Sequence, residues 1–213
     1  MRKVRLTGIL ALATAAHAGT LFSDAGGGNS RTGDGFTLGA RFTVSAPNVN
    51  VVALGIYDAT GGALLTDHEI GLWDVTKGNI QVADATVLAG ANNGGVPGFV
   101  FVPLGFSLPL IVGDQYILGA YFPAGAATDH LLDCCQGAAP TANPSFTGIS
   151  GAFTPSNVVG SLSEPTGVAG HAYVGPNLQF NAPEPGTGML MLAVAVLIGG
   201  LWLRRIKEES DQD

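Results

Sequence analysis

The chain has 213 residues, of which 32 are glycine and only 12% are charged. Its hydrophobic content of 46% argues against a disordered protein, because disordered chains have too few apolar residues to form a core. The formal net charge of −7 would repel a phosphate backbone, so the composition also argues against a nucleic-acid partner.

The N-terminal segment has the three parts of a secretory signal peptide, in order. Three cations lie within the first five residues, and an apolar stretch from Leu6 to Ala16 follows. Ala16 and Ala18 then form an A-x-A cleavage site around His17. We therefore predict a signal peptide over residues 1–18, cleaved after Ala18; an ordinary N-terminal core segment is the disfavoured alternative.

The long middle segment of the chain is acidic. Residues 19–182 hold eleven Asp and Glu residues against three cations, Arg31, Arg41 and Lys77, so their formal charge is −8. The other six cations flank the apolar ends of the chain. This distribution is expected if both ends stay in the cytoplasm while the middle crosses the membrane.

Short apolar runs between Gly, Asn and Asp turns predict the fold of the middle segment. The runs are rich in β-branched and aromatic residues and span 51–57, 69–73, 80–87, 99–102 and 116–121. Such short strands and frequent turns are typical of an antiparallel sandwich. We predict an all-β fold: an antiparallel, jelly-roll-like β-sandwich, with a signal helix before it and a transmembrane helix after it.

Residues 131–181 are less regular and rich in Pro, Ser, Thr and Gly. Apolar pieces occur at 146–149, 158–159, 172–174 and 178–180. We expect long loops here and two or three final strands that complete the sandwich. About fifty such residues are too few to build a second core, so one domain is predicted over 19–182.

Four motifs in the sandwich segment carry a family resemblance. A Gly-x-x-Phe strand (Gly39 and Phe42) precedes LGIYD at 54–58, GLWD at 71–74 and GDQYILGAY at 113–121. In this order they resemble a bacterial secreted β-sandwich family of unknown function. The resemblance implies the fold and supplies no catalytic residues.

The sequence contains no catalytic motif. G-x-S-x-G, Walker A and H-E-x-x-H are all absent. The weakest alternative is a secreted hydrolase, which needs two carboxylates about 5–9 Å apart, such as Glu69 and Asp74. We therefore predict a non-enzymatic protein.

Two pairs of acids are candidates for a calcium site, Asp24 with Asp34 and Asp129 with Asp133. Carboxylates on glycine-rich loops suit calcium, but the spacing of an EF-hand loop is absent. Scattered surface acids are therefore the favoured interpretation. We expect no metal or other cofactor, with calcium as the open alternative.

Cys134 and Cys135 are the only cysteines. Two alternatives remain open for them, a vicinal disulfide and bonds to other chains, and we favour the vicinal bridge. Such a bridge closes no loop, so it adds little stability. A zinc site that combines both cysteines with His130 and Asp133 is disfavoured, because adjacent cysteines rarely bind one tetrahedral ion.

Four aromatic residues are candidates for a platform that stacks on sugar rings: Trp73, Tyr57, Tyr116 and Tyr121. Trp73 lies in an alternating strand pattern, so packing in the core is the favoured interpretation of its ring. Trp73 and Tyr57 are retained as possible glycan contacts.

The C-terminal segment predicts a membrane span. Residues 186–203 contain no charge, and a helix of this length spans about 27 Å, close to the thickness of a bilayer core. Trp202 lies at its end, and Arg204 and Arg205 follow as a stop signal. We predict a transmembrane helix at about 186–203 that anchors the protein.

Pro183, Glu184 and Pro185 stand directly before this helix. Together with the apolar span and the following arginines, they resemble the PEP-CTERM sorting signal of bacterial exopolysaccharide-associated proteins. The resemblance implies that a membrane-embedded exosortase recognises residues 183–213 and cuts near Pro-Glu-Pro, with Arg204 and Arg205 as the cytoplasmic stop. The tail beyond Arg205 is longer and more acidic than is usual in that family.

These features together predict an exported, non-enzymatic protein of the cell surface or extracellular matrix. Its expected partners are the membrane, an exosortase-type protease and extracellular polysaccharide, as in a biofilm. Its main domain is expected outside the cytoplasm, either anchored in the cell envelope or released to the surface. The alternative function is a carbohydrate- or calcium-binding module of the exopolysaccharide layer.

Overall fold

The computed structural model describes residues 16–26, 29–31, 35–124, 129, 131–133, 139–154 and 160–183. Contacts divide the chain into a compact unit, Ala18–Ala182, and a second unit made of the two chain ends. The compact unit begins one residue before the predicted domain and ends at the same residue. The predicted span at 186–203 lies outside the described residues, among which no helix is long and apolar enough to cross a membrane.

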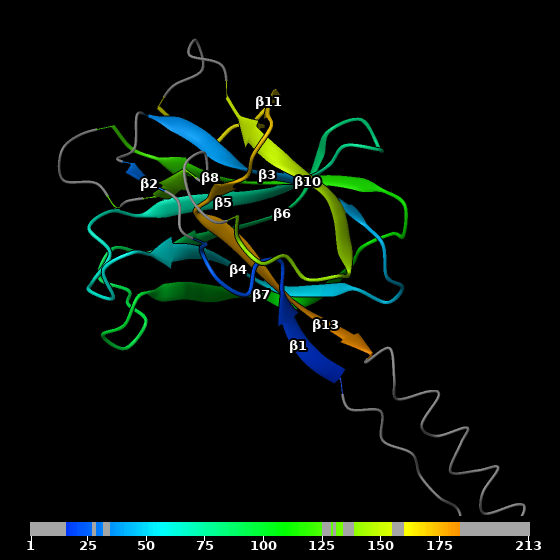
Figure 1. Ribbon diagram of the computed structural model, residues 1–213, viewed down its shortest axis with the longest axis horizontal. Coiled ribbons are helices and arrows are strands. Elements are labelled where there is room, and N and C mark those ends of the chain that lie inside the picture. Colours follow the sequence, from blue (N-terminus) through cyan, green and yellow to red (C-terminus); the bar gives the residue numbers. More distant parts are fainter. Residues whose placement is uncertain are drawn as a thin grey trace, which may run out of the picture. The chain divides into compact units, whose positions relative to one another are not determined.

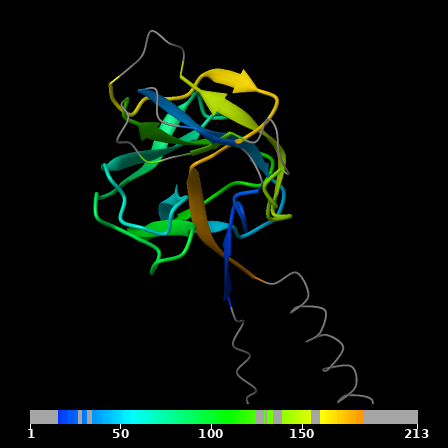
Figure 2. The ribbon, with the colours of Figure 1, turned by 60° about the vertical axis from the view of Figure 1, so that its left-hand side comes forward.

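The compact unit is all-β and antiparallel, and its two larger sheets form two layers (Figures 1 and 2). One sheet has four strands. In spatial order they are β1 (Ala16–Thr20), β13 (Pro176–Pro183), β4 (Asn50–Asp58) and β7 (Gly98–Pro109). This arrangement confirms the predicted all-β antiparallel fold class.

The second sheet has six strands. In spatial order they are β11 (Gly167–Ala169), β10 (Phe146–Phe153), β3 (Phe36–Val44), β8 (Gln115–Phe122), β5 (His68–Asp74) and β6 (Ile80–Val87). A small third sheet joins β12 (Tyr173–Val174), β9 (Leu131–Asp133) and β2 (Asn29–Arg31).

The predicted strands are observed, but β7 runs beyond its expected end at residue 102 to Pro109. The sequence pattern breaks at Pro103, because proline removes a donor from the middle of a sheet. β7 is an edge strand that pairs only with β4 in its sheet, so one side of its backbone has no ladder to interrupt. A proline is tolerated in such a strand.

The core lies between the two sheets, because alternate side chains of each strand point inward. Phe42, Phe146 and Phe180 form its aromatic centre, with ring centroids 5.1 Å apart in both edge-to-face pairs. Leu54 and Leu118 are fully buried beside them. Burying such residues stabilises the fold by roughly 25 cal/mol per Å² of apolar surface.

The outer face of the six-stranded sheet is covered by residues 160–166. Ser163 donates its backbone N–H to the Thr37 hydroxyl (3.1 Å), and Leu162 donates to a Glu69 carboxylate oxygen (3.3 Å). Pro165 lies over Gly119 in the centre of the sheet. This covering segment gives the sandwich a second, smaller apolar layer.

The first and last strands lie side by side in the four-stranded sheet. Leu21 donates its N–H to the Leu178 carbonyl (3.1 Å), and Gly19 lies against the Phe180 ring, so the two segments run in opposite directions. The beginning and the end of the compact unit are therefore adjacent. Cleavage after Ala18 would leave two of the five residues of β1.

The pairing of β13 with β4 places the beginning and end of the compact unit, which we call the exit, at one end of the four-stranded sheet. Asn181 lies opposite Asn50, whereas Pro176 lies opposite Ile56. Tyr57 is therefore about seven residues, or roughly 23 Å, along β4 from the exit. That distal end carries the site described next.

Candidate binding groove

Three aromatic rings line the outer face of the four-stranded sheet near its distal end. Tyr57 of β4 lies opposite Phe99 of β7, and Phe101 is two residues farther along β7. Leu54 and Ile56 point into the core, so the alternating Tyr57 points away from it. We call Tyr57, Phe99 and Phe101 the aromatic strip.

The rings of the aromatic strip contact one another in sequence. The centroids of Tyr57 and Phe99 are 5.2 Å apart, and those of Phe99 and Phe101 are 6.1 Å apart. Gly55 makes this arrangement possible, because a Cβ atom at that position would lie 2.5 Å from the Phe101 ring. The glycine lets the ring lie across β4.

A groove of about 520 Å³ opens beside the strip. Its walls are residues 23–26, which follow β1, together with Tyr57, Phe99 and the Pro97–Gly98 segment at the start of β7. The volume falls within the range of roughly 300–1,000 Å³ that is usual for ligand sites in proteins. The groove combines two aromatic side chains, of which Phe99 also packs against the hydrophobic core, with a polar wall.

Asp24 is the charged residue of that wall. Its Oδ1 accepts hydrogen bonds from the backbone N–H groups of Gly26 (2.9 Å) and Thr141 (3.1 Å). Hydrogen bonds from the side chain and backbone of Thr141 lower the pKa of Asp24 below 3.8, so the carboxylate stays ionised in neutral and mildly acidic solution. Asp24 is therefore a fixed negative charge and an acceptor.

Tyr57 keeps its phenol proton. Burial, and then the charge of Asp58, raise the pKa of Tyr57 above 10. The hydroxyl is therefore a neutral group that can donate and accept. No Lys or Arg lies among the groove's lining residues in the described part of the chain.

The structure separates the aromatic residues that the sequence offered as glycan contacts. Trp73 is 4% exposed and packs with Ile117 and Ala152 on the covered face, with its ring over Gly71. That position leaves no ring face open for a sugar, and it matches the favoured core interpretation. Tyr116 is also buried, which leaves Tyr57 as the residue of this set that lines the groove.

Phe99 and Phe101 were not predicted as site residues from the sequence. Their Phe-Val-Phe-Val pattern predicted a strand. The pattern also indicates that the two phenylalanines lie on the same face, because side chains two residues apart in a strand point the same way. The pattern does not indicate which strand pairs with this one. The register of β7 against β4 places both rings on the same face as Tyr57.

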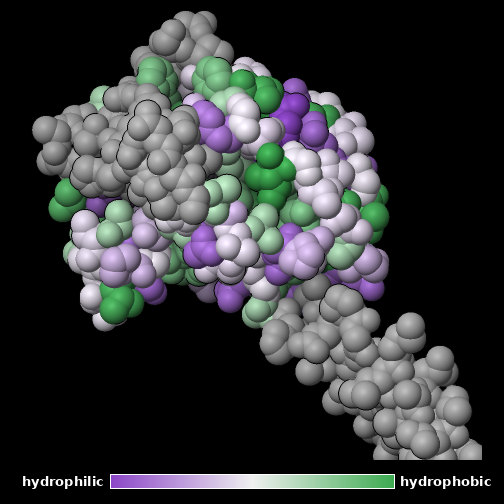
Figure 3. All heavy atoms as spheres, in the orientation of Figure 1, coloured by the Kyte–Doolittle hydropathy of each residue, from purple (hydrophilic) through white to green (hydrophobic). Residues whose placement is uncertain are grey.

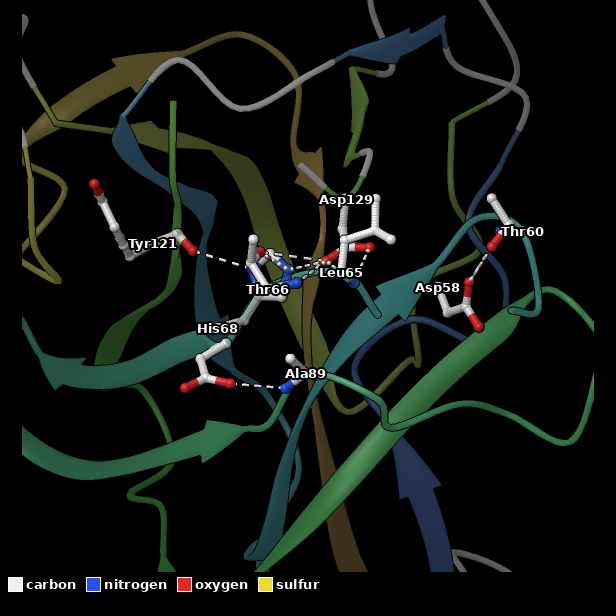
Figure 4. Close-up of polar contacts among 9 residues, drawn as sticks. Asp58, Thr60, Leu65, Thr66, His68, Ala89, Tyr121 and Asp129 are labelled. Carbon is white, nitrogen blue, oxygen red and sulfur yellow. Dashed lines mark hydrogen bonds and ion pairs between the residues drawn. The ribbon is translucent and has the colours of Figure 1, made fainter. Parts of the chain in front are cut away.

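A buried polar cluster lies at the beginning of β5 (Figure 4). His68 is 0% exposed; its Nδ1 is 3.1 Å from the Tyr121 carbonyl oxygen, and its Nε2 is 2.9 Å from Asp129 Oδ2. Both ring nitrogens therefore lie within hydrogen-bond distance of an oxygen atom. Asp129 also accepts from the backbone N–H groups of Leu65 and Thr66. These hydrogen bonds hold residue 129 against the loop before β5.

The carboxylate pair suggested for a hydrolase does not assemble. Glu69 is exposed on the outer face of β5 and accepts from Leu162, whereas Asp74 is 1% exposed and binds Lys77 Nζ at 2.8 Å. The two residues point to opposite faces of the strand, since their numbers differ by an odd count. They cannot flank one glycosidic bond.

Among the described residues, no group of three or more His, Cys, Asp or Glu side chains is placed to hold a metal ion. Asp129 is engaged by protein donors. The side chains of Asp34 and Asp133 are not described, and Cys134, Cys135 and His130 lie outside the described residues.

The predicted processing residues fall mostly beyond the described chain. Ala16 and Ala18 belong to β1, and Pro183 is the last residue of β13. Glu184, Pro185, Arg204 and Arg205 lie outside the described residues.

Hydrophobic side chains are scattered on the face of the molecule drawn in Figure 3, which mixes hydrophilic and hydrophobic residues. Single exposed apolar residues such as Leu65, Leu88 and Phe106 are common on folded proteins and need no partner. The groove is distinguished by ring-to-ring contact and a neighbouring carboxylate, not by exposure alone.

In comparisons with known proteins, no family model matches the chain, and no curated protein matches its sequence. The resemblances of the tail and of the sandwich motifs therefore stay predictions.

Proposed function

We propose that this chain is an exported, non-enzymatic surface or matrix protein, held at the membrane by its C-terminal segment. The observation that carries the proposal is the extent of the compact unit, Ala18–Ala182. The unit starts where the predicted signal peptide ends and stops where the Pro-Glu-Pro motif begins. A folded domain bounded in this way has a complete core without either apolar end.

The proposed route uses both ends in turn. The signal peptide directs export, and the apolar span with Arg204 and Arg205 stops transfer and anchors the protein. An exosortase-type protease then recognises Pro183-Glu184-Pro185 and releases or transfers the domain. The main domain thus works outside the cytoplasm, in the cell envelope or its polysaccharide layer.

We also propose that the sandwich is a jelly roll. Support comes from the two strand orders, β1-β13-β4-β7 in one sheet and β3-β8-β5-β6 in the other. Eight strands distributed in this way, with most successive strands changing sheets, are the arrangement of a double Greek key. β10 and β11 extend the second sheet at the free edge of β3.

Truncation of the tail tests the anchoring. A chain that lacks residues 183–207 should be found in the medium, whereas a chain that still carries its uncut tail should sediment with membranes. Unchanged membrane fractionation of the truncated protein would overturn the proposal. Replacing Pro183, Glu184 and Pro185 together by alanine is the matched control, since the anchor then stays while processing is lost.

Intact mass measures the processing directly. The mature wild-type protein should lack residues 1–18 and should end near Pro-Glu-Pro, and the triple-alanine variant should keep its tail. A wild-type protein that retains both ends would contradict the route.

The alternative function, a carbohydrate- or calcium-binding module, is favoured in its carbohydrate form by one observation. The aromatic strip lies beside an ionised acceptor, Asp24, which is a suitable combination for a sugar. No group of three or more His, Cys, Asp or Glu side chains in the ranges that the structure describes supports the calcium form.

A further inference from the structure

We propose that the groove between the aromatic strip and residues 23–26 binds a neutral polysaccharide chain and excludes acidic ones. The inference deepens the carbohydrate alternative by giving it a site and a class of ligand. It does not depend on how the tail is processed.

The aromatic side chains supply the contact area. Tyr57 and Phe99 line the groove, and Phe101 continues the same row of rings along β7. The apolar faces of sugar rings lose water when they stack on such side chains, and aromatic residues offer large area at a low cost in side-chain entropy. A row of rings suits an extended polymer better than a single small molecule.

The polar wall supplies orientation. Asp24 accepts two backbone hydrogen bonds through Oδ1, and the side chains of Thr141 and Ser23 also donate to this carboxylate. An ionised carboxylate accepts strongly from hydroxyl groups, and the Tyr57 phenol adds a donor. Sugar hydroxyls match both groups.

The charge of the site selects the class of glycan. Asp24 is the charged group among the lining residues, and residues 19–182 carry a formal charge of −8. Of the cations in this segment whose side chains are described, Arg41 bonds Gln115 and Lys77 bonds Asp74, so neither serves the groove. A polymer rich in carboxylates or sulfates would meet repulsion, and the described lining residues offer no cation to pair with it.

The position of the groove fits a polymer ligand. Tyr57 lies roughly 23 Å along β4 from the strand pair that contains Ala18 and Ala182. In a tethered protein this places the groove at the end of the sheet opposite its point of attachment. A polysaccharide outside the cell can reach such a site.

Calorimetry with the full-length chain, kept in a detergent without a sugar headgroup, tests the inference. The probes are cellohexaose, maltohexaose and chitohexaose as neutral chains, and hexagalacturonate as the acidic one. At least one neutral probe should bind, and hexagalacturonate should bind at least tenfold more weakly. Absence of binding by all three neutral probes at millimolar concentration, or stronger binding of hexagalacturonate, would overturn it.

Variants locate the binding. Tyr57→Ala and Phe99→Ala should each weaken binding of the neutral probe at least tenfold, because each removes a ring that lines the groove. A factor of ten corresponds to about 1.4 kcal/mol. Phe106→Ala is the matched control, because Phe106 is 54% exposed and does not line the groove, and it should bind as the wild type does. Equal losses in all three variants, or no loss in the first two, would contradict the assignment, provided that circular dichroism shows each variant folded.

Asp24→Asn separates the two parts of the claim. The affinity of this variant for the neutral probe should stay within about tenfold of the wild type, because an amide oxygen still accepts hydrogen bonds. The ratio between its affinities for the neutral probe and for hexagalacturonate should become smaller, because the negative charge is gone. An unchanged ratio between the neutral and acidic probes would remove the role of Asp24 in selectivity. Fractionation of the truncated chain remains a separate experiment, so either proposal can fail while the other stands.

Discussion

The outer faces of the two large sheets differ: one is covered by another segment of the chain, and the other is partly open to solvent. On the six-stranded sheet, residues 160–166 cover Trp73 and the glycines around it. On the four-stranded sheet, Tyr57, Phe99 and Phe101 keep part of their surface open to solvent beside a groove. Both faces carry aromatic residues at outward positions of a strand, so strand alternation alone does not decide whether a ring is a binding surface.

What decides the outcome is a segment distant in the chain. Residues 160–166 follow Trp73 by almost ninety positions, and their contacts with Thr37 and Glu69 fix them over that sheet. Nothing described covers the aromatic strip in the same way. The comparison can be tested by measuring what each ring contributes to stability.

The largest effect is expected at Trp73. Trp73→Ala removes a nearly buried indole and leaves a cavity, so it should lower the free energy of unfolding by about 3–5 kcal/mol. Thermal unfolding followed by circular dichroism measures it. A loss below about 1 kcal/mol would show that the covering segment does not depend on the indole.

A mostly buried and an exposed carboxylate, Asp129 and Asp24, are expected to differ in their contribution to stability. Asp129→Asn weakens the bond to fully buried His68 and should cost about 1–3 kcal/mol. Asp24→Asn alters an exposed carboxylate and should stay within about 0.5 kcal/mol. Urea unfolding of both variants compares them, and equal costs would mean that the His68 cluster is not a stabilising contact.

Truncation of the open rings should affect stability less than truncation of Trp73. Phe101→Ala exposes Gly55 but leaves no enclosed cavity, so we expect a loss of about 1 kcal/mol or less. A cost comparable to that of Trp73→Ala would mean that the aromatic strip is part of the core, and it would weaken the case for a binding surface.

The smallest effects concern pH, and they have opposite signs on the two faces. Burial raises the pKa of Glu164 on the covered face above 4.5, so wild-type stability should decline slightly as pH rises through that window. Hydrogen bonds lower the pKa of Asp24, so its contribution is present above 3.8 and is lost as pH falls below that value.

Melting temperatures across pH separate these two contributions. Glu164→Gln should raise the melting temperature slightly at pH 7 and leave it unchanged at pH 4. Asp24→Asn should remove part of the loss below pH 3.8. The same sign for both residues would contradict the assignment of burial to one and hydrogen bonding to the other.

Most of the fold was predictable because its signals are local. The strands around Leu54, Leu72 and Leu118 follow from β-branched and aromatic runs that end at Gly, Asn and Asp turns. The full length of β7 was not predictable, because the effect of Pro103 depends on whether the strand lies at an edge. The strand order fixes that, and it is a property of the whole sheet.

The site was predictable only in part, for the same reason. Tyr57 was identified from its residue type, but Phe99 and Phe101 join it through cross-strand register, and Asp24 joins through the path of the chain after β1. The open groove at Tyr57 and the covering of Trp73 both depend on contacts between distant segments. A single sequence does not contain that information in local form.

The burial of Trp73 also makes the molecule its own reporter. The chain has two tryptophans, and the other, Trp202, belongs to the predicted span, so a chain that ends before Pro183 has a single indole. Its fluorescence should be blue-shifted while residues 160–166 shield it and should move to the red when water reaches it. The emission maximum thus gives an optical signal of whether that segment is in place, without any added label.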